Sequence, residues 1–281
     1  MRIALTGASG YVGRGLRMVL EAHHFEVIPV SRKDFNSTIL KEKLAYADGV
    51  IHLAGESIGG IWTKAKRKRI YESRVFTTRR LVDIITELKG NISFFITISG
   101  VGIYDTDHIQ TERSAWFAED FLAQVIRDWE DQANRLLLAN VRVAVIRSGV
   151  VLSDHGGILK LLMVPFNIGF GYGIRSFHNF PVIHYTDLMR VFLWIVEHPE
   201  SYGVYNAVLP EFLTIHDFFC QIGKRKNKRL RVMLSPLLLK MMMGESSILL
   251  TKGQWVVPQR ILNEGFLFEY AHVGAALDDC I

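Results

Sequence analysis

Cysteine and proline are scarce in this sequence. Its 281 residues include only 2 cysteines, Cys220 and Cys280, and 7 prolines. Two cysteines are too few for a disulfide framework or a cysteine-rich zinc site, and they suit a reducing compartment. The sequence also shows no close cluster of metal ligands, so we expect no metal.

A long apolar run is missing as well. The longest weakly polar stretch covers residues 161–174, and Pro165 and several glycines interrupt it. A membrane-spanning helix needs about 20 apolar residues. The first residues also lack the charged and apolar segments of a signal peptide. We therefore expect a cytoplasmic protein with no membrane partner.

The sequence has no large excess of one charge. Lys and Arg number 33 and Asp and Glu 28, which gives a formal charge of +5, and 49% of the residues are hydrophobic. This composition folds, and a modest positive balance fits an anionic ligand such as a nucleotide. Basic runs at 64–69 and 224–231 permit nucleic acid, but no aromatic residues interleave them as stacking platforms. We therefore do not expect a nucleic-acid partner.

Short apolar runs alternate with longer amphipathic ones through the first half of the chain. This pattern predicts strands at 2–6, 25–30, 50–53, 93–99 and 141–147, and helices at 11–22, 64–88 and 117–138. Strands that alternate with helices are typical of a Rossmann-type α/β fold with a doubly wound parallel sheet. The second half predicts a strand at 181–184, a helix at 187–198, a strand at 203–208 and several helical pieces to residue 279.

Three glycines follow the first predicted strand. They are Gly7, Gly10 and Gly13 in the segment TGASGYVG, which opens the first helix. In dinucleotide-binding folds such glycines permit a tight turn, a close approach of the pyrophosphate and close packing of the helix. We expect the ligand phosphates beside Gly7, Ser9, Gly10, Tyr11, Val12 and Gly13. The alternative is a glycine-rich turn without a ligand.

The end of the second strand indicates which dinucleotide would bind. An NAD site carries Asp or Glu there, about 20 residues after the loop, on the ribose hydroxyls. This chain has Ser31 and Arg32 directly after Val30. A guanidinium can pair with a 2′-phosphate, and Ser31 can add its hydroxyl and backbone N–H. The sequence therefore predicts NADP(H), with an ordinary exposed arginine as the alternative.

The glycine loop and the segment 52–56, which reads HLAGE, resemble the extended short-chain dehydrogenase/reductases. Further matching segments narrow the resemblance to an atypical, epimerase-like branch, the NAD(P)-dependent epimerase/dehydratase family, and cover essentially the whole chain. They include Trp62-Thr63, Ser73-Arg74-Val75, Trp129-Glu130, residues 147–152, Ile183-His184 and Pro258-Gln259-Arg260. The resemblance implies an NADP(H) site built from Ser31, Arg32, Leu53, Ala54, Gly55, Arg69, Arg74, Ser99 and Val151. For Arg69 the alternative is a solvated helix face.

Ordinary members of this superfamily use a Tyr-xxx-Lys pair, in which the tyrosine moves the proton. None of the 9 tyrosines is followed by Lys four residues later. In the register of the resemblance, Phe121 and Val125 occupy the two positions, and neither side chain can transfer a proton. Weak substitutes are Glu56, Ser99, Tyr104 and His184. Ser99 could equally be a turn serine, Tyr104 a packed tyrosine, and His184 a core histidine whose neighbour Asp187 supports a helix N-terminus.

These observations lead to two hypotheses. The first is an NADP(H)-binding oxidoreductase or epimerase-like enzyme that acts on a small molecule. The alternative, which the absent pair favours, is a non-catalytic NADP(H)-binding redox sensor or partner-docking protein. We place the Rossmann domain at residues 1–156 and a smaller C-terminal substrate lobe at 157–281. The lobe is expected to close a cleft at the carboxyl edge of the sheet, where Arg175 and His178 could meet an anionic substrate.

Overall fold

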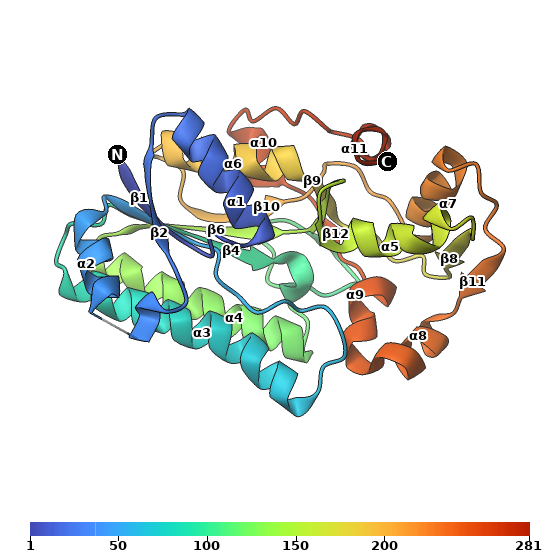
Figure 1. The fold of residues 1–281 in the computed structure, drawn as a ribbon, viewed down its shortest axis with the longest axis horizontal. Helices are drawn as coiled ribbons and strands as arrows, with labels where there is room; N and C mark the ends of the chain where they lie inside the picture. The colour runs from blue at the N-terminus through green and yellow to red at the C-terminus, as the bar shows by residue number, and fades with distance from the viewer. Residues whose placement is uncertain (37) are drawn as a thin grey trace.

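A parallel six-stranded sheet forms the centre of the computed structural model, which describes residues 1–36 and 38–281 (Figure 1). The strand order is β10-β6-β4-β3-β1-β2, and every neighbouring pair is parallel. The strands are β1 (Arg2–Thr6), β2 (Glu26–Val30), β3 (Gly49–His52), β4 (Phe94–Gly100), β6 (Arg142–Ser148) and β10 (Gly203–Ala207). Their apolar runs are buried because helices cover both faces.

Two helical layers enclose this sheet. Helices α1 (Tyr11–Ala22) and α6 (Tyr185–Glu197) lie on one face, and α2 (Ile39–Tyr46), α3 (Lys64–Glu87) and α4 (Phe121–Asn134) lie on the other (Figure 1). Each layer buries its own apolar cluster against the strands. The predicted Rossmann-type, doubly wound α/β fold is therefore confirmed.

Two predicted boundaries need correction. The helix predicted at 117–138 begins at Phe121, because the Asp120 carboxylate accepts the backbone N–H of Ala123 and caps the helix. It ends at Asn134, and residues 135–139 form a separate 3-10 helix. Helix α2 was not predicted at all. The division of the chain at residue 156 stays a prediction, and the central layers also take in α6 and β10 from beyond it.

The remaining elements lie mostly beyond the carboxyl ends of the strands (Figure 1). Two small parallel strand pairs lie here, β7 (Val150–Leu152) with β9 (Val182–His184) and β8 (Tyr172–Ile174) with β11 (Val232–Leu234). They share one apolar cluster with three helices, α5 (Gly157–Asn167), α7 (Ile215–Arg225) and α11 (Val273–Cys280). Further elements are β5 (Ile109–Gln110), β12 (Trp255–Val256), α8 (Pro236–Met243), α9 (Ile248–Thr251) and α10 (Gln259–Asn263). Within the described residues, no helix is both long and apolar enough to cross a membrane.

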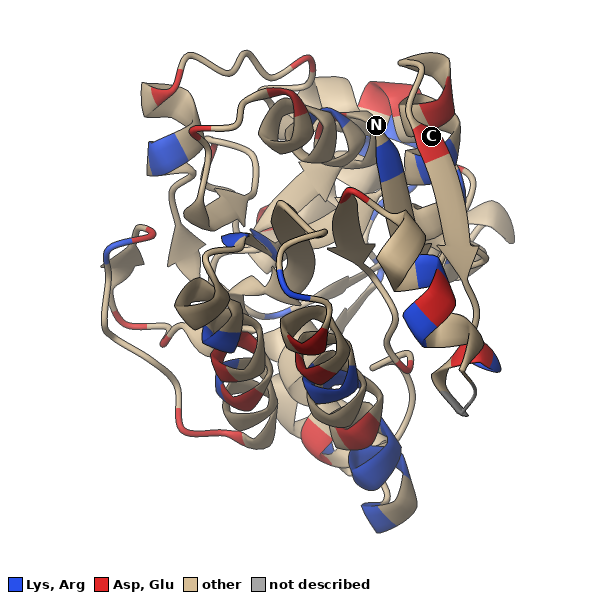
Figure 2. Ribbon diagram, turned by 90° about the vertical axis from the view of Figure 1, so that its left-hand side faces the viewer, with Lys and Arg blue, Asp and Glu red and all other residues tan. Residues whose placement is uncertain are grey.

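Charged residues of both signs are interleaved on the surface. Figure 2 shows acidic and basic segments side by side on the helices of the side that faces the viewer. In the basic run at the start of α3, Lys66 pairs with Glu56, Arg67 with Glu245, and Lys68 with Glu72. Each of these three cations therefore forms an ion pair with a neighbouring carboxylate, whereas the basic stripe that binds a nucleic-acid backbone is open.

A buried ion pair joins the sheet to helix α4. Arg147 on β6 donates from Nε to Glu130 Oε1 over 2.9 Å and from Nη2 to Oε2 over 2.6 Å. Only 5% of each residue is exposed. Burial lowers the pKa of Arg147, but the hydrogen bonds and the charge of Glu130 outweigh burial, and the pKa rises overall. Arg147 is therefore a cation in the core.

The same pair gathers further polar groups. Ser99 donates to Glu130 Oε1 over 2.7 Å, and Arg147 Nη1 donates to the Tyr104 hydroxyl over 2.8 Å. Tyr104 in turn donates to Asn206 Oδ1, 2.9 Å away on β10. This chain of hydrogen bonds, which we call the Arg147 network, connects β4, β6, β10 and α4. It satisfies the donors of a cation that would be costly to bury alone.

Replacing Arg147 tests the energetic weight of this network. We expect Arg147→Met to lower the free energy of unfolding by about 3–5 kcal/mol, because Glu130 stays buried without its counter-ion. Urea denaturation followed by circular dichroism measures the change. The control is Arg135→Met, which breaks an ion pair with Asp83 whose side chains are 46% and 44% exposed, and it should cost less than about 1 kcal/mol. A loss as small as that for Arg147→Met would contradict this account of the core.

Candidate functional site

The glycine loop connects β1 to α1 as predicted. Gly7 has φ +69°, and a Cβ atom there would lie 2.9 Å from the carbonyl carbon and oxygen of Leu53. A Cβ atom on Gly13 would lie 2.1 Å from the Gly7 carbonyl oxygen. Both positions therefore require glycine, one for its backbone conformation and the close approach of β3, the other for the packing of the helix on the loop.

The first turn of α1 is open to an anion. Gly10 is the N-cap and contributes no side-chain hydrogen bond, and the first turn holds no acidic residue. Helix N-termini expose backbone N–H groups and the positive end of the helix dipole. Arg14 Nη1 donates to the Ser9 carbonyl oxygen over 2.8 Å and brings a cation to the loop. The loop, with Ser9, Gly10, Tyr11 and Val12, therefore has the form of a phosphate site.

A closed turn follows β2. Asp34 N–H donates to the Ser31 carbonyl over 3.1 Å, and the Asp34 carboxylate accepts the Ser31 N–H over 2.7 Å. Arg32 and Lys33 lie between them and are exposed. In this arrangement the Ser31 N–H donates to Asp34, and the role of Ser31 at a phosphate stays a prediction. A capping box, Ser-x-x-Asp, is the sequence signal that could have shown this.

Asp34 is itself paired. Lys43 on α2 donates from Nζ to Asp34 Oδ2 over 2.8 Å and to the Pro29 carbonyl over 2.8 Å. Burial raises the pKa of Asp34, but the bonds from Lys43 and Ser31 outweigh burial and lower it overall. Asp34 is therefore a carboxylate whose charge Lys43 balances.

The segment after β3 is held to the glycine loop through Thr6. The Thr6 hydroxyl accepts the N–H groups of Leu53 over 3.1 Å and Ala54 over 3.2 Å. Its remaining proton points to His52 Nδ1, 2.6 Å away. Because His52 is fully buried and lies near the Arg74 cation, its pKa falls to about 3. A neutral histidine therefore supports the backbone that runs past the glycine loop.

Arg74 lies directly beneath this segment. Its Nη1 donates to the Glu56 carbonyl over 2.9 Å, and a Cβ atom on Gly55 would lie 3.2 Å from its Cζ. Burial lowers the pKa of Arg74 to about 10, so the side chain still carries its charge at neutral pH. Arg69 is instead 57% exposed, with its Nε 3.6 Å from Glu56. The structure thus brings Arg74 to the segment and leaves Arg69 on a solvated face.

Glu56 is an ion-paired carboxylate. Lys66 Nζ lies 2.9 Å from its Oε1. The hydrogen bond from Lys66 is the main reason that the pKa of Glu56 is lowered. A general acid near neutral pH needs a raised pKa, so this environment does not suit the proposed acid role.

Ser99 and Tyr104 belong to the Arg147 network. Tyr104 is fully buried and Ser99 is 8% exposed, and burial raises the pKa of Tyr104. Phe121 packs on Trp62, with the two ring centroids 5.6 Å apart. The Cζ atom of Arg67 lies 4.2 Å from the centroid of the Phe121 ring, and Val125 is buried. The positions of the usual proton-transfer pair are therefore part of an apolar cluster.

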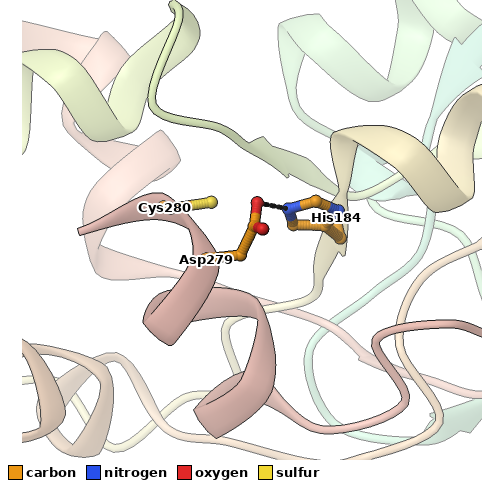
Figure 3. Close-up of side chains that lie close together, drawn as sticks. All are labelled: His184, Asp279 and Cys280. Atoms are coloured by element: carbon orange, nitrogen blue, oxygen red, sulfur yellow. Dashed lines mark hydrogen bonds and ion pairs between the residues drawn. The ribbon is translucent and has the colours of Figure 1, made fainter.

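His184 caps helix α6, and Figure 3 shows its ring facing Asp279 of the C-terminal helix. Its Nδ1 accepts the Thr186 N–H over 3.2 Å, so Nε2 carries the proton that faces Asp279 Oδ2 at 3.1 Å.

His184, Asp279 and Cys280 bring three ligand atoms within 4.8 Å of one another. A metal-bound histidine donates its other N–H, whereas Nδ1 here faces a donor. Burial also raises the pKa of the Cys280 thiol to about 12, so these residues do not fit a metal.

Asp187 lies in the first turn of α6, where a carboxylate supports the helix N-terminus as the alternative for this residue held. Its carboxylate accepts the N–H groups of Glu269 and Tyr270, each over 2.9 Å. Asp187 therefore also anchors a late segment of the chain, while the side-chain cap of α6 is His184. Arg175 is exposed and His178 half-buried in the loop after β8.

Val151 completes the group of segments around the loop. A Cβ atom on Gly157 would lie 3.3 Å from the Val151 carbonyl, and one on Gly156 would lie 2.8 Å from the Tyr11 ring. The start of α5 therefore packs on the first residue of α1. The glycine loop, the segment after β3 and the segment after β7 meet at one edge of the sheet.

Fold and site together define a Rossmann-type protein with a dinucleotide-type glycine loop. Residues 3–119 match the model of the NAD dependent epimerase/dehydratase family, and residues 236–280 match a domain of unknown function, DUF1731. The epimerase family protein SDR39U1 of Homo sapiens is 32% identical over 298 residues, covering 100% of both chains. The chain belongs to this epimerase family.

Two further relatives extend the match. The epimerase family protein YfhF of Bacillus subtilis is 29% identical over 298 residues, covering 100% of this chain and 98% of that protein. The crystal structure of human SDR39U1 (isoform 2) with NADPH superimposes with a TM-score of 0.86 and 28% identity, over 99% of this chain and 98% of that one. The family resemblance expected from the sequence is confirmed.

The buried His52 predicts a pH-dependent stability. Its pKa is about 3 in the folded protein and about 6.5 in an unfolded chain. The unfolded state therefore binds more protons between these values, and stability present above pH 6.5 is lost as the pH falls. From pH 7 to 5 this group alone should remove about 2 kcal/mol from the free energy of unfolding.

His52→Asn should flatten this dependence, because an amide oxygen can accept the Thr6 hydroxyl and does not titrate. Urea denaturation at pH 7 and pH 5 gives the difference for each protein. His24→Asn is the control, since His24 is exposed with φ +61°, and it should keep the wild-type dependence. If wild type and His52→Asn lost equal stability, the buried neutral histidine would not be the cause.

Proposed function

We propose that this chain is an NADP(H)-binding oxidoreductase or epimerase-like protein that acts on a small molecule. The observation that carries the proposal is the turn after β2, which exposes Arg32 while Lys43 balances the charge of Asp34. A 2′-phosphate needs positive charge at this place. The human relative crystallised with NADPH supports the same cofactor.

The residues around the loop fit such a cofactor. The open first turn of α1 would hold the pyrophosphate, and Gly7 and Gly13 allow the tight loop because their neighbours leave no room for a Cβ atom. Arg32 would hold the 2′-phosphate, Leu53, Ala54 and Gly55 would line the cofactor with backbone, and Val151 would lie at the nicotinamide half. Arg74, a cation beside Gly55, would balance phosphate charge.

The cofactor, when bound, supplies the hydride, and the protein orients the reactants. Proton transfer would not come from the usual pair, because Phe121 and Val125 occupy it and Tyr104 is enclosed in the Arg147 network. The packing of Phe121 is the observation that favours the alternative, a non-catalytic NADP(H)-binding sensor or docking protein. Turnover with the small molecule that co-purifies, identified by mass spectrometry, would separate the two.

Arg32→Ala tests the cofactor. A hydrogen bond to a charged group contributes about 1.5–3 kcal/mol, and about 1.4 kcal/mol is tenfold in affinity. We therefore expect wild-type protein to bind NADPH about 10–100-fold more tightly than NADH. Arg32→Ala should weaken NADPH and leave NADH nearly unchanged, as measured by nucleotide fluorescence titration.

The preference should also shrink as salt rises, because Arg32 is exposed and ions screen it. Lys89→Ala, a change of an exposed residue two positions after the end of α3, is the control and should keep wild-type affinities. Equal wild-type affinities for the two nucleotides would overturn the assignment. Equal losses for both in Arg32→Ala would mean that Arg32 acts by stacking on adenine.

A further inference from the structure

The turn after β2 contains an acid that an NADP(H) site must keep neutralised. Asp34 lies four residues beyond the end of β2 and is only 8% exposed. Its carboxylate closes the turn that exposes Arg32 and Lys33. An uncompensated carboxylate here would repel a 2′-phosphate, and acids at the end of this strand are the groups that bind the ribose hydroxyls of NAD.

Lys43 is the group that compensates Asp34. It reaches from α2 to the same oxygen, Oδ2, that accepts the Ser31 N–H, with distances of 2.8 Å and 2.7 Å. It also donates to the Pro29 carbonyl near the end of β2. The Lys43 and Asp34 side chains are 29% and 11% exposed, so solvent screens this pair less than a surface pair.

We propose that Lys43 is a specificity-determining positioning residue for the cofactor, which it does not need to touch. By fixing the Asp34 carboxylate on the Ser31 N–H and cancelling its charge, Lys43 leaves Arg32 and Lys33 to act on the 2′-phosphate. Without Lys43, the acid would repel NADPH and become available to the ribose of NADH. This inference rests on the proposed function and names how its site selects between the two nucleotides.

The experiment compares two lysines of the same helix. Lys43→Met removes the cation that pairs with Asp34. Lys41→Met removes a cation that pairs with Glu87, and in that pair the Lys41 and Glu87 side chains are 54% and 59% exposed. Fluorescence titration gives the dissociation constants of NADPH and NADH for each protein. We expect Lys43→Met to lower the NADPH preference by about five- to tenfold, through weaker NADPH binding with equal or tighter NADH binding. Lys41→Met should leave the ratio within about twofold of wild type.

A rescue variant isolates the charge of Asp34. Asp34→Asn keeps an oxygen that can accept the Ser31 N–H and removes the negative charge. Asp34→Asn alone should keep or raise the NADPH preference. The double variant Asp34→Asn/Lys43→Met should regain most of the preference lost in Lys43→Met. Thermal unfolding of each variant confirms that it is folded, and the Asp34→Asn result stands even if Lys43→Met does not fold.

The outcomes separate this inference from the proposed function. The role of Lys43 would be overturned if Lys43→Met kept the wild-type preference for NADPH, or if that variant lost NADPH and NADH affinity equally. Neither outcome would affect the proposed function. A double variant no better than Lys43→Met would show that the charge of Asp34 is not the reason. Equal affinities of the wild-type protein for the two nucleotides would overturn the proposed function, and this inference with it.

Discussion

The buried pair of Arg147 and Glu130 is the interaction on which the arrangement around the sheet edge depends. A charged pair in the core is tolerated only when every donor and acceptor is satisfied, and here Ser99, Tyr104 and then Asn206 supply the remaining bonds. The network reaches further, because the Glu112 carboxylate accepts the N–H groups of both Asn206 and Arg260. One ion pair thus connects the Rossmann strands to late segments of the chain.

This use of polar groups has a consequence for chemistry. In the register of the sequence resemblance, Ser99 corresponds to the serine of the superfamily, and its hydroxyl donates to Glu130. Phe121 takes the place of the tyrosine and packs on Arg67, which also pairs with Glu245 in the DUF1731 segment over 2.6 Å. Positions that usually transfer protons therefore stabilise contacts between α3, α4 and the C-terminal region. Under the proposed function, Phe121 and Val125 cannot supply the proton of a reaction at this edge.

The sequence predicts those features that arise from local sterics and composition. The glycine loop follows from Gly7 and Gly13, whose neighbours leave no room for a Cβ atom, and the apolar strands follow from burial on both faces. Long-range pairings leave no such trace: Tyr104 and Asn206 lie 102 residues apart, and Asp187 holds a segment more than 80 residues later. The turn at Ser31 is local as well, and its sequence signal is an acid three residues after a serine, which places Asp34 within reach of the Ser31 N–H.

The same electrostatic arrangement occurs twice along the edge where a dinucleotide would lie. After β2, Asp34 pairs with Lys43 from the next helix, and after β3, Glu56 pairs with Lys66 from the next helix. In both cases the lysine lowers the pKa of the carboxyl group, so the acid stays ionised but balanced. The Asp34 carboxylate accepts the Ser31 N–H, whereas Glu56 is held through its backbone, whose carbonyl accepts a hydrogen bond from Arg74. Because lysines cancel the acids, the arginines beside them are left to set the potential that the phosphates meet.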